Sequence, residues 1–465
     1  MIDFERISQY HENNRIEAKR SLGGLPKSLW ETYSAFANTY GGILLLGVEE
    51  LSDKSFQTVN LPCPEKLVEE FWEIINDRER VSVNILKKQD VTIQTIGEDR
   101  IISIMIPRAD RRNKPVYIGG NPYLGSYRRD GEGDYHCSRE EVQTMLRDRE
   151  ERTQDEKVLF HKDTSVFDRE TIRRYRTYLE DIHTGYDWKQ YEDDQILCGI
   201  GAAQRDEEGL LHPTAAGLLV FGFEDEIVRE YPYFYLDYQE RMGEKGLTER
   251  LVSNSGKWSG NLFDFYLRIS GKVVRGLPSD IHRAVREAVA NCMVNGDYLG
   301  RGGLVIVKKK DDLRISNPGS FRIDIRDAVN GGKSDPRNAL IARMFNLVKV
   351  GSRTGKGVPD IYQVWEKKGW KMPQVKERLQ PDRITVKLPL YEDNTAQLDE
   401  RFFGKYQKYR DDLINYVTRV IQVENITVME RLALDRQEAE QLLQQMEEEG
   451  ILMPMEGENG YRLKI

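Results

Sequence analysis

Four side chains near the start of the chain have the types and spacing that metal-dependent phosphodiester chemistry uses. Glu12 and Glu17 precede a helix-forming stretch, Glu50 follows an apolar run, and Lys19 lies two residues after Glu17. In an extended segment Glu17 and Lys19 point to the same face. Carboxylates bind Mg²⁺ or Mn²⁺, and a lysine can hold a phosphate. One hypothesis is a metal site formed by Glu12, Glu17 and Glu50, with Lys19 beside it. The alternative is that these acids are solvated residues at strand ends.

The elements that would position these side chains are a strand, a helix and a second strand. The pattern predicts a strand at 16–19, a helix from about Pro26 to Asn38, a Gly-Gly turn, and an apolar strand at 43–48. Further along, the periodicity predicts a helix over 64–80 and strands over 81–89, 91–96 and 100–107.

The segment E-x4-E-x-K followed by SAFANTYGGILLLGVEE resembles the AlbA-type Schlafen domain, over about the first 145 residues. Some Schlafen proteins are metal-dependent RNases that act on tRNA and rRNA through two Glu and one Asp. The resemblance implies that Glu12, Glu17 and Glu50 take these places, with Lys19 beside them. Two departures are Ala18, where the family usually has Phe, and Glu50, where it has Asp. Many bacterial relatives are described only as DNA-binding or regulatory domains, so the fold leaves the activity open.

A basic, tyrosine-bearing segment lies between about residues 107 and 134. Its candidate phosphate-binding residues are Arg108, Arg111, Arg112, Lys114, Arg128 and Arg129. Tyr117, Tyr123 and Tyr127 are interleaved with them. Such a mixture suits backbone phosphates and unpaired bases, which predicts RNA or a single strand as partner. The alternative is a solvated hairpin with its aromatic rings packed underneath.

A second set of functional side chains lies on a predicted helix near residue 290. Glu287 and Asn291 are four residues apart and stack on one helix face. The sequence REAVANCMVNGDY resembles the N-box of the divergent GHKL ATPase domain linked to Schlafen-like proteins, and PRNALIARMF also matches that domain. The resemblance implies that Glu287 activates water and that Asn291 holds magnesium on the nucleotide phosphates.

The rest of the expected nucleotide site is less conventional. Asn317-Pro318-Gly319 stands where other GHKL proteins carry an adenine-binding aspartate, so we expect Asp297 or Asp324 to substitute. Glycines further on can present backbone N–H groups to phosphates. These are Gly351, Gly355 and Gly357. The site predicts ATP as a ligand, and the alternative is a degenerate scaffold used for dimerisation.

Composition limits the classes of protein. With 39% hydrophobic and 31% charged residues, the 465-residue chain suits a soluble, multidomain protein. A net charge of -8 requires any nucleic-acid contact to come from a local basic patch. Its 4 cysteines have no C-x-x-C pairing, which fits a reducing cytosol. No apolar run approaches the roughly 18 residues of a membrane span and no signal peptide is expected, so we predict a cytoplasmic location.

The predicted fold class is α+β multidomain: a Schlafen-like α/β domain, a GHKL-like α/β sandwich and a C-terminal winged helix. The predicted domains are a Schlafen/AlbA-like nucleic-acid-binding or nuclease domain at 1–150, a connecting α/β layer at 151–270, a divergent GHKL ATPase-like domain at 271–400 and the winged helix at 401–465. The third helix of the winged-helix region is strongly acidic, which disfavours duplex binding and favours homo-oligomerisation.

Three functions remain open. The first is a Schlafen-like metal-dependent endonuclease acting on tRNA-like RNA or single strands, regulated by nucleotide binding or oligomerisation; the domain pairing makes antiphage defence a further hypothesis. The second is a non-catalytic nucleic-acid-binding transcriptional regulator with an ATP-binding domain. The third, an ATPase that remodels nucleic acid, is the weakest, because the chain has no Walker loop.

Overall fold

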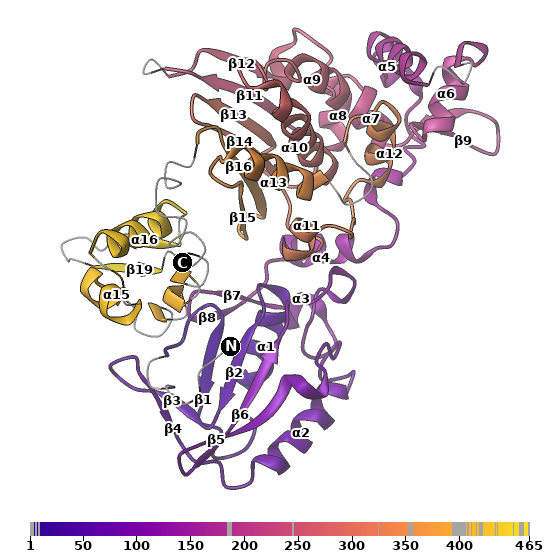
Figure 1. The fold of residues 1–465 in the computed structure, drawn as a ribbon. Coiled ribbons are helices and arrows are strands. Elements are labelled where there is room, and N and C mark those ends of the chain that lie inside the picture. Colours follow the sequence, from indigo (N-terminus) through magenta and orange to yellow (C-terminus); the bar gives the residue numbers. More distant parts are fainter. Residues whose placement is uncertain are drawn as a thin grey trace. The chain divides into compact units, whose positions relative to one another are not determined.

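Two compact units make up the chain, which we describe in a computed structural model. One unit comprises residues 1–149 with 395–465, and the other comprises 150–394 (Figure 1). The structure describes all residues except 1–3, 5, 6, 8, 9, 184–187, 244, 245, 324, 352–356, 393–405, 407, 408, 411, 415, 418–421, 433, 435, 450, 455–459, 464 and 465.

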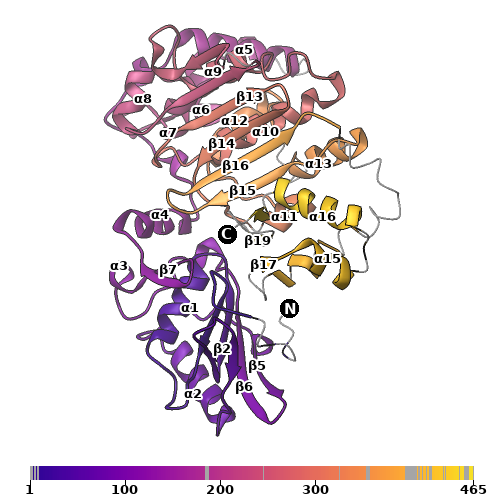
Figure 2. The ribbon, with the colours of Figure 1, turned by 90° about the vertical axis from the view of Figure 1, so that its left-hand side faces the viewer.

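A four-stranded sheet forms the centre of the N-terminal region. Its strands, in spatial order, are β1 (Ile16–Lys19), β2 (Gly42–Leu46), β6 (Asp99–Ile106) and β5 (Val91–Ile96). The β1–β2 pair is parallel and the other pairs are antiparallel. Helices α1 (Ser28–Asn38) and α2 (Pro64–Asn76) lie on one side of β2 and β6, as Figure 2 shows. The apolar run of β2 is buried on both faces: Leu44 and Leu46 pack with these helices, and Leu45 packs on the opposite face.

The connection between α1 and β2 explains the double glycine of the sequence. Leu29, Tyr33 and Phe36 recur at helical spacing and are fully buried, which directs α1 onto the sheet. Gly41 has a φ of +74°, and a Cβ there would lie 2.8 Å from the backbone nitrogen of Arg108. A Cβ on Gly42 would lie 2.7 Å from the Phe36 ring. Larger residues at this turn would therefore separate α1 from the sheet.

Shorter elements complete this region. They are β3 (Val48–Glu50), β4 (Phe56–Thr58), η2 (Lys88–Asp90), η3 (Arg111–Asn113), α3 (Pro122–Gly125), β7 (Tyr127–Asp130), β8 (Gly133–His136) and α4 (Arg139–Arg149). The strand predicted over 81–89 is wrong. Only an isolated bridge, between Val81 and Ile118, forms there. Beyond it the backbone bonds a side chain: the Tyr33 hydroxyl donates to the Val83 carbonyl and accepts from the Ile85 N–H, each at 3.0 Å.

The second unit is built on a six-stranded sheet. Its strands, in spatial order, are β12 (Glu249–Val252), β11 (Leu236–Arg241), β13 (Leu304–Lys309), β14 (Asp312–Pro318), β16 (Arg383–Pro389) and β15 (Gln374–Arg378). Only β11 and β13 pair in parallel. Along β13, burial alternates, with Leu304, Ile306 and Lys308 on the buried face. Strands from the predicted connecting layer and from the predicted ATPase-like domain thus share one sheet.

Helices line the buried face of this sheet and extend beyond it. Helix α10 (His282–Asn295) contacts β14, and α9 (Leu262–Ile269), α12 (Ala339–Leu347) and α13 (Gly357–Lys368) contact α10. Helix α11 (Ile325–Asn330) contacts α13. The remaining elements are η4 (Gln154–Glu156), η5 (Thr164–Val166), α5 (Arg169–Ile182), η6 (Trp188–Gln190), α6 (Asp193–Ile200), β9 (Ala203–Arg205), β10 (Leu211–Pro213), α7 (Ala215–Phe221), α8 (Glu224–Glu230), η7 (Ser253–Ser255) and η8 (Ser279–Ile281). Thr214 caps α7, because its hydroxyl oxygen accepts a hydrogen bond from the Gly217 N–H.

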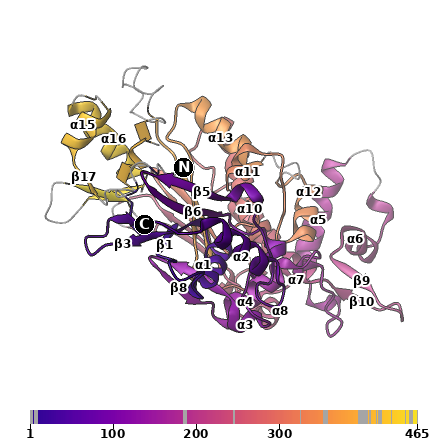
Figure 3. The ribbon, with the colours of Figure 1, turned by 90° about the horizontal axis from the view of Figure 1, so that it is seen from below.

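The C-terminal region has its own small core. It contains β17 (Gln422–Val423), α15 (Asn425–Leu432), α16 (Arg436–Glu448), β18 (Leu452–Pro454) and β19 (Tyr461–Leu463), with sheet order β17-β19-β18. Figure 3 shows α15, α16 and β17 of this region. The winged helix stays a prediction, since part of the first expected helix lies outside the described residues. Within the described ranges, no helix combines the length and apolar character needed to span a bilayer.

Candidate functional site

The predicted acidic residues of the N-terminal region lie close together at one end of β1 and β3. The backbone N–H of Glu12 donates to Oε1 of Glu50 at 2.9 Å, and Oε1 of Glu12 accepts from the Ala18 N–H at 3.1 Å. Burial, followed by the charges of Glu17 and Glu50, raises the pKa of Glu12 to about 6. Glu12 and Glu50 therefore bind backbone groups that join the start of the chain to the sheet.

Glu17 is held on both of its oxygens. Lys19 lies 2.8 Å from Oε1, so the same-face prediction for this pair is confirmed, and Arg129 lies 2.8 Å from Oε2. Arg129 is itself 1% exposed in its side chain and pairs with Asp134 at 3.0 Å. It also donates to the Asn13 carbonyl at 2.8 Å. This network ties β1 to the β7–β8 hairpin.

These acids do not form a metal-binding group in this arrangement. Both oxygens of Glu17 are paired with cations, and Glu12 and Glu50 each bind a backbone N–H. Among the described residues, no three His, Cys, Asp or Glu side chains converge to hold an ion. The donor set therefore does not fit the expected Mg²⁺ or Mn²⁺ ion, and no catalytic step is derived through one.

The six basic residues expected to bind phosphates do not share an exposed surface. Only Arg112 among them is exposed. Arg111 and Arg129 are buried, and Arg111 donates to the Asp148 carbonyl. Lys114 donates to the Asn38 carbonyl at 2.6 Å. Partly buried residues complete the set: Arg108, which has protein partners, and Arg128, which pairs with Glu141 at 3.3 Å. Most of these cations stabilise the fold, which corrects the expected basic surface.

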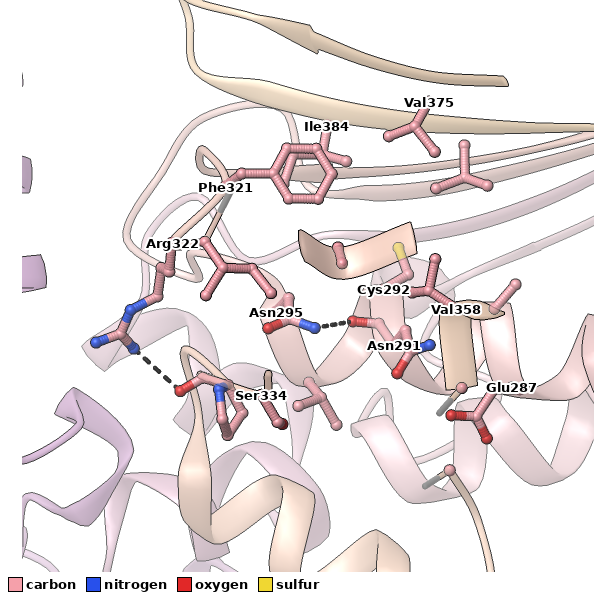
Figure 4. Close-up of a pocket in the computed structure, with 18 of the residues that line it drawn as sticks. Glu287, Asn291, Cys292, Asn295, Phe321, Arg322, Ser334, Val358, Val375 and Ile384 are labelled. Carbon is pink, nitrogen blue, oxygen red and sulfur yellow. Dashed lines mark hydrogen bonds between the residues drawn. The ribbon is translucent and has the colours of Figure 1, made fainter. Parts of the chain in front are cut away.

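In the second unit, a pocket lies between α10 and the sheet. Its volume of about 190 Å³ exceeds that of a single-water site and leaves room for a small molecule. Figure 4 places Glu287, Asn291 and Asn295 along α10. Apolar side chains lie opposite them, and those labelled in Figure 4 are Phe321, Val375 and Ile384. A polar wall thus faces an apolar wall.

The helical spacing of Glu287 and Asn291 places both side chains in this pocket. Ala288 and Cys292 also line it, while Val285 and Val289 pack into the core. The side-chain amide of Asn291 has no hydrogen-bond partner in the described part of the chain. A polar group inside a pocket without a protein partner is available to a ligand.

Two of the three predicted glycines also line the pocket. Gly351 adopts a φ of +81°. Gly357 begins α13, and a Cβ there would lie 2.1 Å from Oε1 of Glu287, so the carboxylate lies against the first turn of that helix. The third, Gly355, lies outside the described residues.

Asp297 differs from its prediction as a cofactor-binding residue. It does not line the pocket; its Oδ1 accepts from the Leu299 N–H at 3.1 Å and stabilises the turn after α10. Asp324, its predicted alternative, lies outside the described residues. Residues that the sequence left unassigned, Phe321 and Ile384, form much of the apolar wall. The apolar alternation of the strand around Ile384 is a signal for that residue alone.

Fold and pocket together define a multidomain α+β protein with an acid-bearing N-terminal region and a ligand-sized pocket in its second unit. Residues 12–138 match the family model "Schlafen, AlbA_2". Residues 305–388 match the model "Putative ATP-dependent DNA helicase recG C-terminal", and residues 143–237 match a domain of unknown function, DUF8451. The chain therefore has the architecture of a nucleic-acid-binding protein with an ATPase-like domain.

Two solved structures are among those similar to this chain. The DIP2311 protein from Corynebacterium diphtheriae is 17% identical over 97% of this chain and 79% of its own, with a TM-score of 0.42. The N-terminal domain of a putative ATP-dependent DNA helicase RecG-related protein from Nitrosomonas europaea is 31% identical over 29% of this chain and 90% of its own, with a TM-score of 0.23. No curated protein sequence matches the chain.

Proposed function

We propose that this protein binds nucleic acid and that its second unit binds a purine nucleotide, ATP with magnesium, in the pocket between α10 and the sheet. The observation that carries the proposal is the meeting of Glu287 and Asn291 in one pocket with Gly351 and Gly357. The oxygens of Glu287 and Asn291 are of the kind that magnesium prefers. Glycine backbone can approach phosphates closely, and the apolar wall suits the faces of a base.

The two ends of the pocket would then have separate tasks. Asn291, whose amide has no protein partner among the described residues, would orient the phosphates together with the magnesium ion that accompanies them. Glu287 would accept a proton from an attacking water if hydrolysis follows binding. Both side chains come from one helix turn, so their spacing is rigid.

Nucleic-acid binding is proposed for the N-terminal region, with RNA or a single strand as the preferred partner. The Schlafen AlbA_2 match supports binding. Exposed rings of Tyr123 (41%) and Tyr135 (52%) support unpaired bases, which stack on aromatic faces. Fluorescence anisotropy with labelled tRNA, single-stranded DNA and duplex tests this preference. Equal or tighter binding of the duplex would contradict it.

Titration calorimetry of the full chain with ATP and Mg²⁺ tests the nucleotide site. Asn291→Ala should weaken ATP binding at least about tenfold, the cost of a lost charged or metal-linked contact. Arg283→Ala is the matched control, because Arg283 lies on the same helix, is exposed and does not line the pocket. Absence of ATP binding to the wild type would overturn the proposal.

Light scattering with and without ATP tests the predicted homo-oligomer.

Metal-dependent cleavage of RNA, with a role in antiphage defence, is the second candidate. One observation favours it: Glu12, Glu17 and Glu50 lie near one another, and burial, followed by the charges of Glu17 and Glu50, raises the pKa of Glu12. In the arrangement described above their oxygens bind protein groups, so this function requires a metal ion to displace those partners. Incubation of labelled tRNA and single-stranded DNA with Mn²⁺ or EDTA tests it, with Glu12→Gln as the variant. Cutting that requires the metal and disappears in the variant would support a nuclease. Intact substrates under every condition would leave the acids with a structural role.

A further inference from the structure

The six-stranded sheet of the second unit has a face that lies opposite its helices. On β13, Ile306 is fully buried in the core that the helices share, so Val307 and Lys309 lie on the opposite face. Residues paired across neighbouring strands share a face, so the register assigns the outward residues of the other strands. We call this surface the outer face.

Cations outnumber carboxylates on the outer face. Its two carboxylates are buried and already paired: Asp237 with Arg250 at 2.8 Å, and Asp312 with Arg314 at 3.0 Å. Among the residues that the structure describes, no carboxylate pairs with the further cations Arg241, Lys309, Lys376, Arg378 and Lys387. In a chain whose net charge is -8, this face is a local concentration of positive charge.

The cations of β14, β15 and β16 lie close enough to repel one another. Burial lowers the pKa of Lys387, and the Asp312 carboxylate opposes this shift. The positive charges of Arg314, Lys371 and Lys376 lower the pKa of Lys387 further. Arg314 is directly opposite Lys387 across the two strands. A bound anion would relieve this repulsion.

The positive charge is accessible and extends across the sheet. Arg241, Arg250, Arg314, Lys376 and Arg378 are exposed. Neighbouring strands lie about 4.8 Å apart, so the cations from β12 to β15 span roughly 24 Å. A single phosphate or carboxylate group would contact only a small part of that width. A polyanion with regularly repeated charges can contact cations on several strands at once.

We propose that the outer face binds the sugar–phosphate backbone of nucleic acid, as a contact surface in addition to the N-terminal region. This inference rests on the proposed nucleic-acid binding. The central strands β13, β14 and β16 present Val307, Ser316 and Thr385 between the cations, so no aromatic ring lies there for a base to stack on. The face therefore responds to phosphate charge and not to sequence. It supplies the basic surface that the sequence led us to expect at residues 107–134.

Fluorescence anisotropy of the full chain with labelled tRNA and single-stranded DNA, over a range of KCl concentrations, tests the outer face. Lys376→Gln combined with Arg378→Gln removes exposed cations of β15. This double variant should bind both ligands at least about tenfold more weakly at about 50 mM KCl. The slope of log affinity against log salt concentration should become shallower by about 1 for each cation removed.

Arg283→Gln combined with Lys367→Gln is the matched control. Both residues are exposed cations, and they lie on α10 and α13, on the helical side of the sheet. The two double variants lose the same charge, so a difference between them reports the position of that charge. The control should keep the affinity and the salt dependence of the wild type.

The outcomes separate this inference from the proposed function. Equal weakening in the two double variants, or no weakening in Lys376→Gln/Arg378→Gln, would overturn the outer face and leave nucleic-acid binding standing. A wild type that binds neither ligand would overturn the proposed nucleic-acid binding itself.

Lysine acetylation of the wild type, read by mass spectrometry, requires no variant to fold. Bound tRNA should protect Lys309 and Lys376 from the reagent and leave Lys367 reactive, since Lys367 lies on α13. Unchanged reactivity of Lys309 and Lys376 in the presence of saturating tRNA would contradict the proposal.

Discussion

Replacing Arg129 by methionine should destabilise the N-terminal region more than any neighbouring change. The Arg129 side chain is 1% exposed and pairs with Glu17 at 2.8 Å and with Asp134 at 3.0 Å. Its guanidinium also lies over the Phe36 ring, 5.2 Å from the centroid. Methionine keeps much of the apolar contact but leaves two largely buried carboxylates without this cation. Removing one partner of a buried ion pair costs about 3–5 kcal/mol.

Arg128 provides a control from the adjacent position. Its side chain is 25% exposed and pairs with Glu141 at 3.3 Å. Removing a pair of that exposure costs less than about 1 kcal/mol. The two variants thus replace the same residue type in the same strand, and the expected losses of stability differ widely.

Hydrogen exchange followed by mass spectrometry measures the loss of unfolding free energy region by region. It suits the full chain because a multidomain protein does not unfold in a single two-state step. Amides of β1 and β7 should exchange at least about 100-fold faster in Arg129→Met, which equals roughly 3 kcal/mol. They should change less than about fivefold in Arg128→Met. Equal acceleration in the two variants would refute the buried network. Glu17→Gln combined with Arg129→Met should cost less than the sum of the single changes.

Three further predictions concern single side chains. Burial and neighbouring carboxylates raise the pKa of Glu12 from 4.5 to about 6. Its contribution to stability is therefore present below pH 4.5 and lost as the pH rises through 6. Glu12→Gln should remove this decline in the unfolding free energy of the N-terminal region, measured by hydrogen exchange across that pH range. Gly357→Ala places a Cβ 2.1 Å from a flexible carboxylate oxygen of Glu287, so it should weaken ATP binding. Because the two positions are in contact, Glu287→Ala should reduce ATP affinity less in the Gly357→Ala protein than in the wild type. Nζ of Lys308 donates to the carbonyl oxygens of Lys272 at 2.8 Å and Arg275 at 2.7 Å. Lys308→Met leaves both carbonyls without this donor, so it should lower the unfolding free energy of the second unit by at least about 2 kcal/mol, measured by hydrogen exchange.

Local pattern predicted much of what positions the sites. The apolar spacing of Leu29, Tyr33 and Phe36 is sufficient to define α1 and its buried face. The i, i+4 spacing of Glu287 and Asn291 places both in one pocket, because a helix turn repeats at that interval whatever its surroundings.

Contacts between residues that lie far apart in the sequence could not be predicted from it. Arg129 lies in a polar hairpin, where an arginine is usually solvated, and only its pairing with Glu17, 112 residues away, buries it. The segment at 81–89 is predicted as a strand, yet the Tyr33 hydroxyl binds its backbone at Val83 and Ile85.

The affinity of the full chain for ATP with Mg²⁺, compared between wild type and Asn291→Ala by titration calorimetry, tests the proposed function most directly. We predict saturable binding at one site per chain, at least about tenfold weaker in Asn291→Ala and unchanged in Arg283→Ala. Binding that is absent in the wild type, or equally strong in Asn291→Ala, would contradict a nucleotide site between α10 and the sheet.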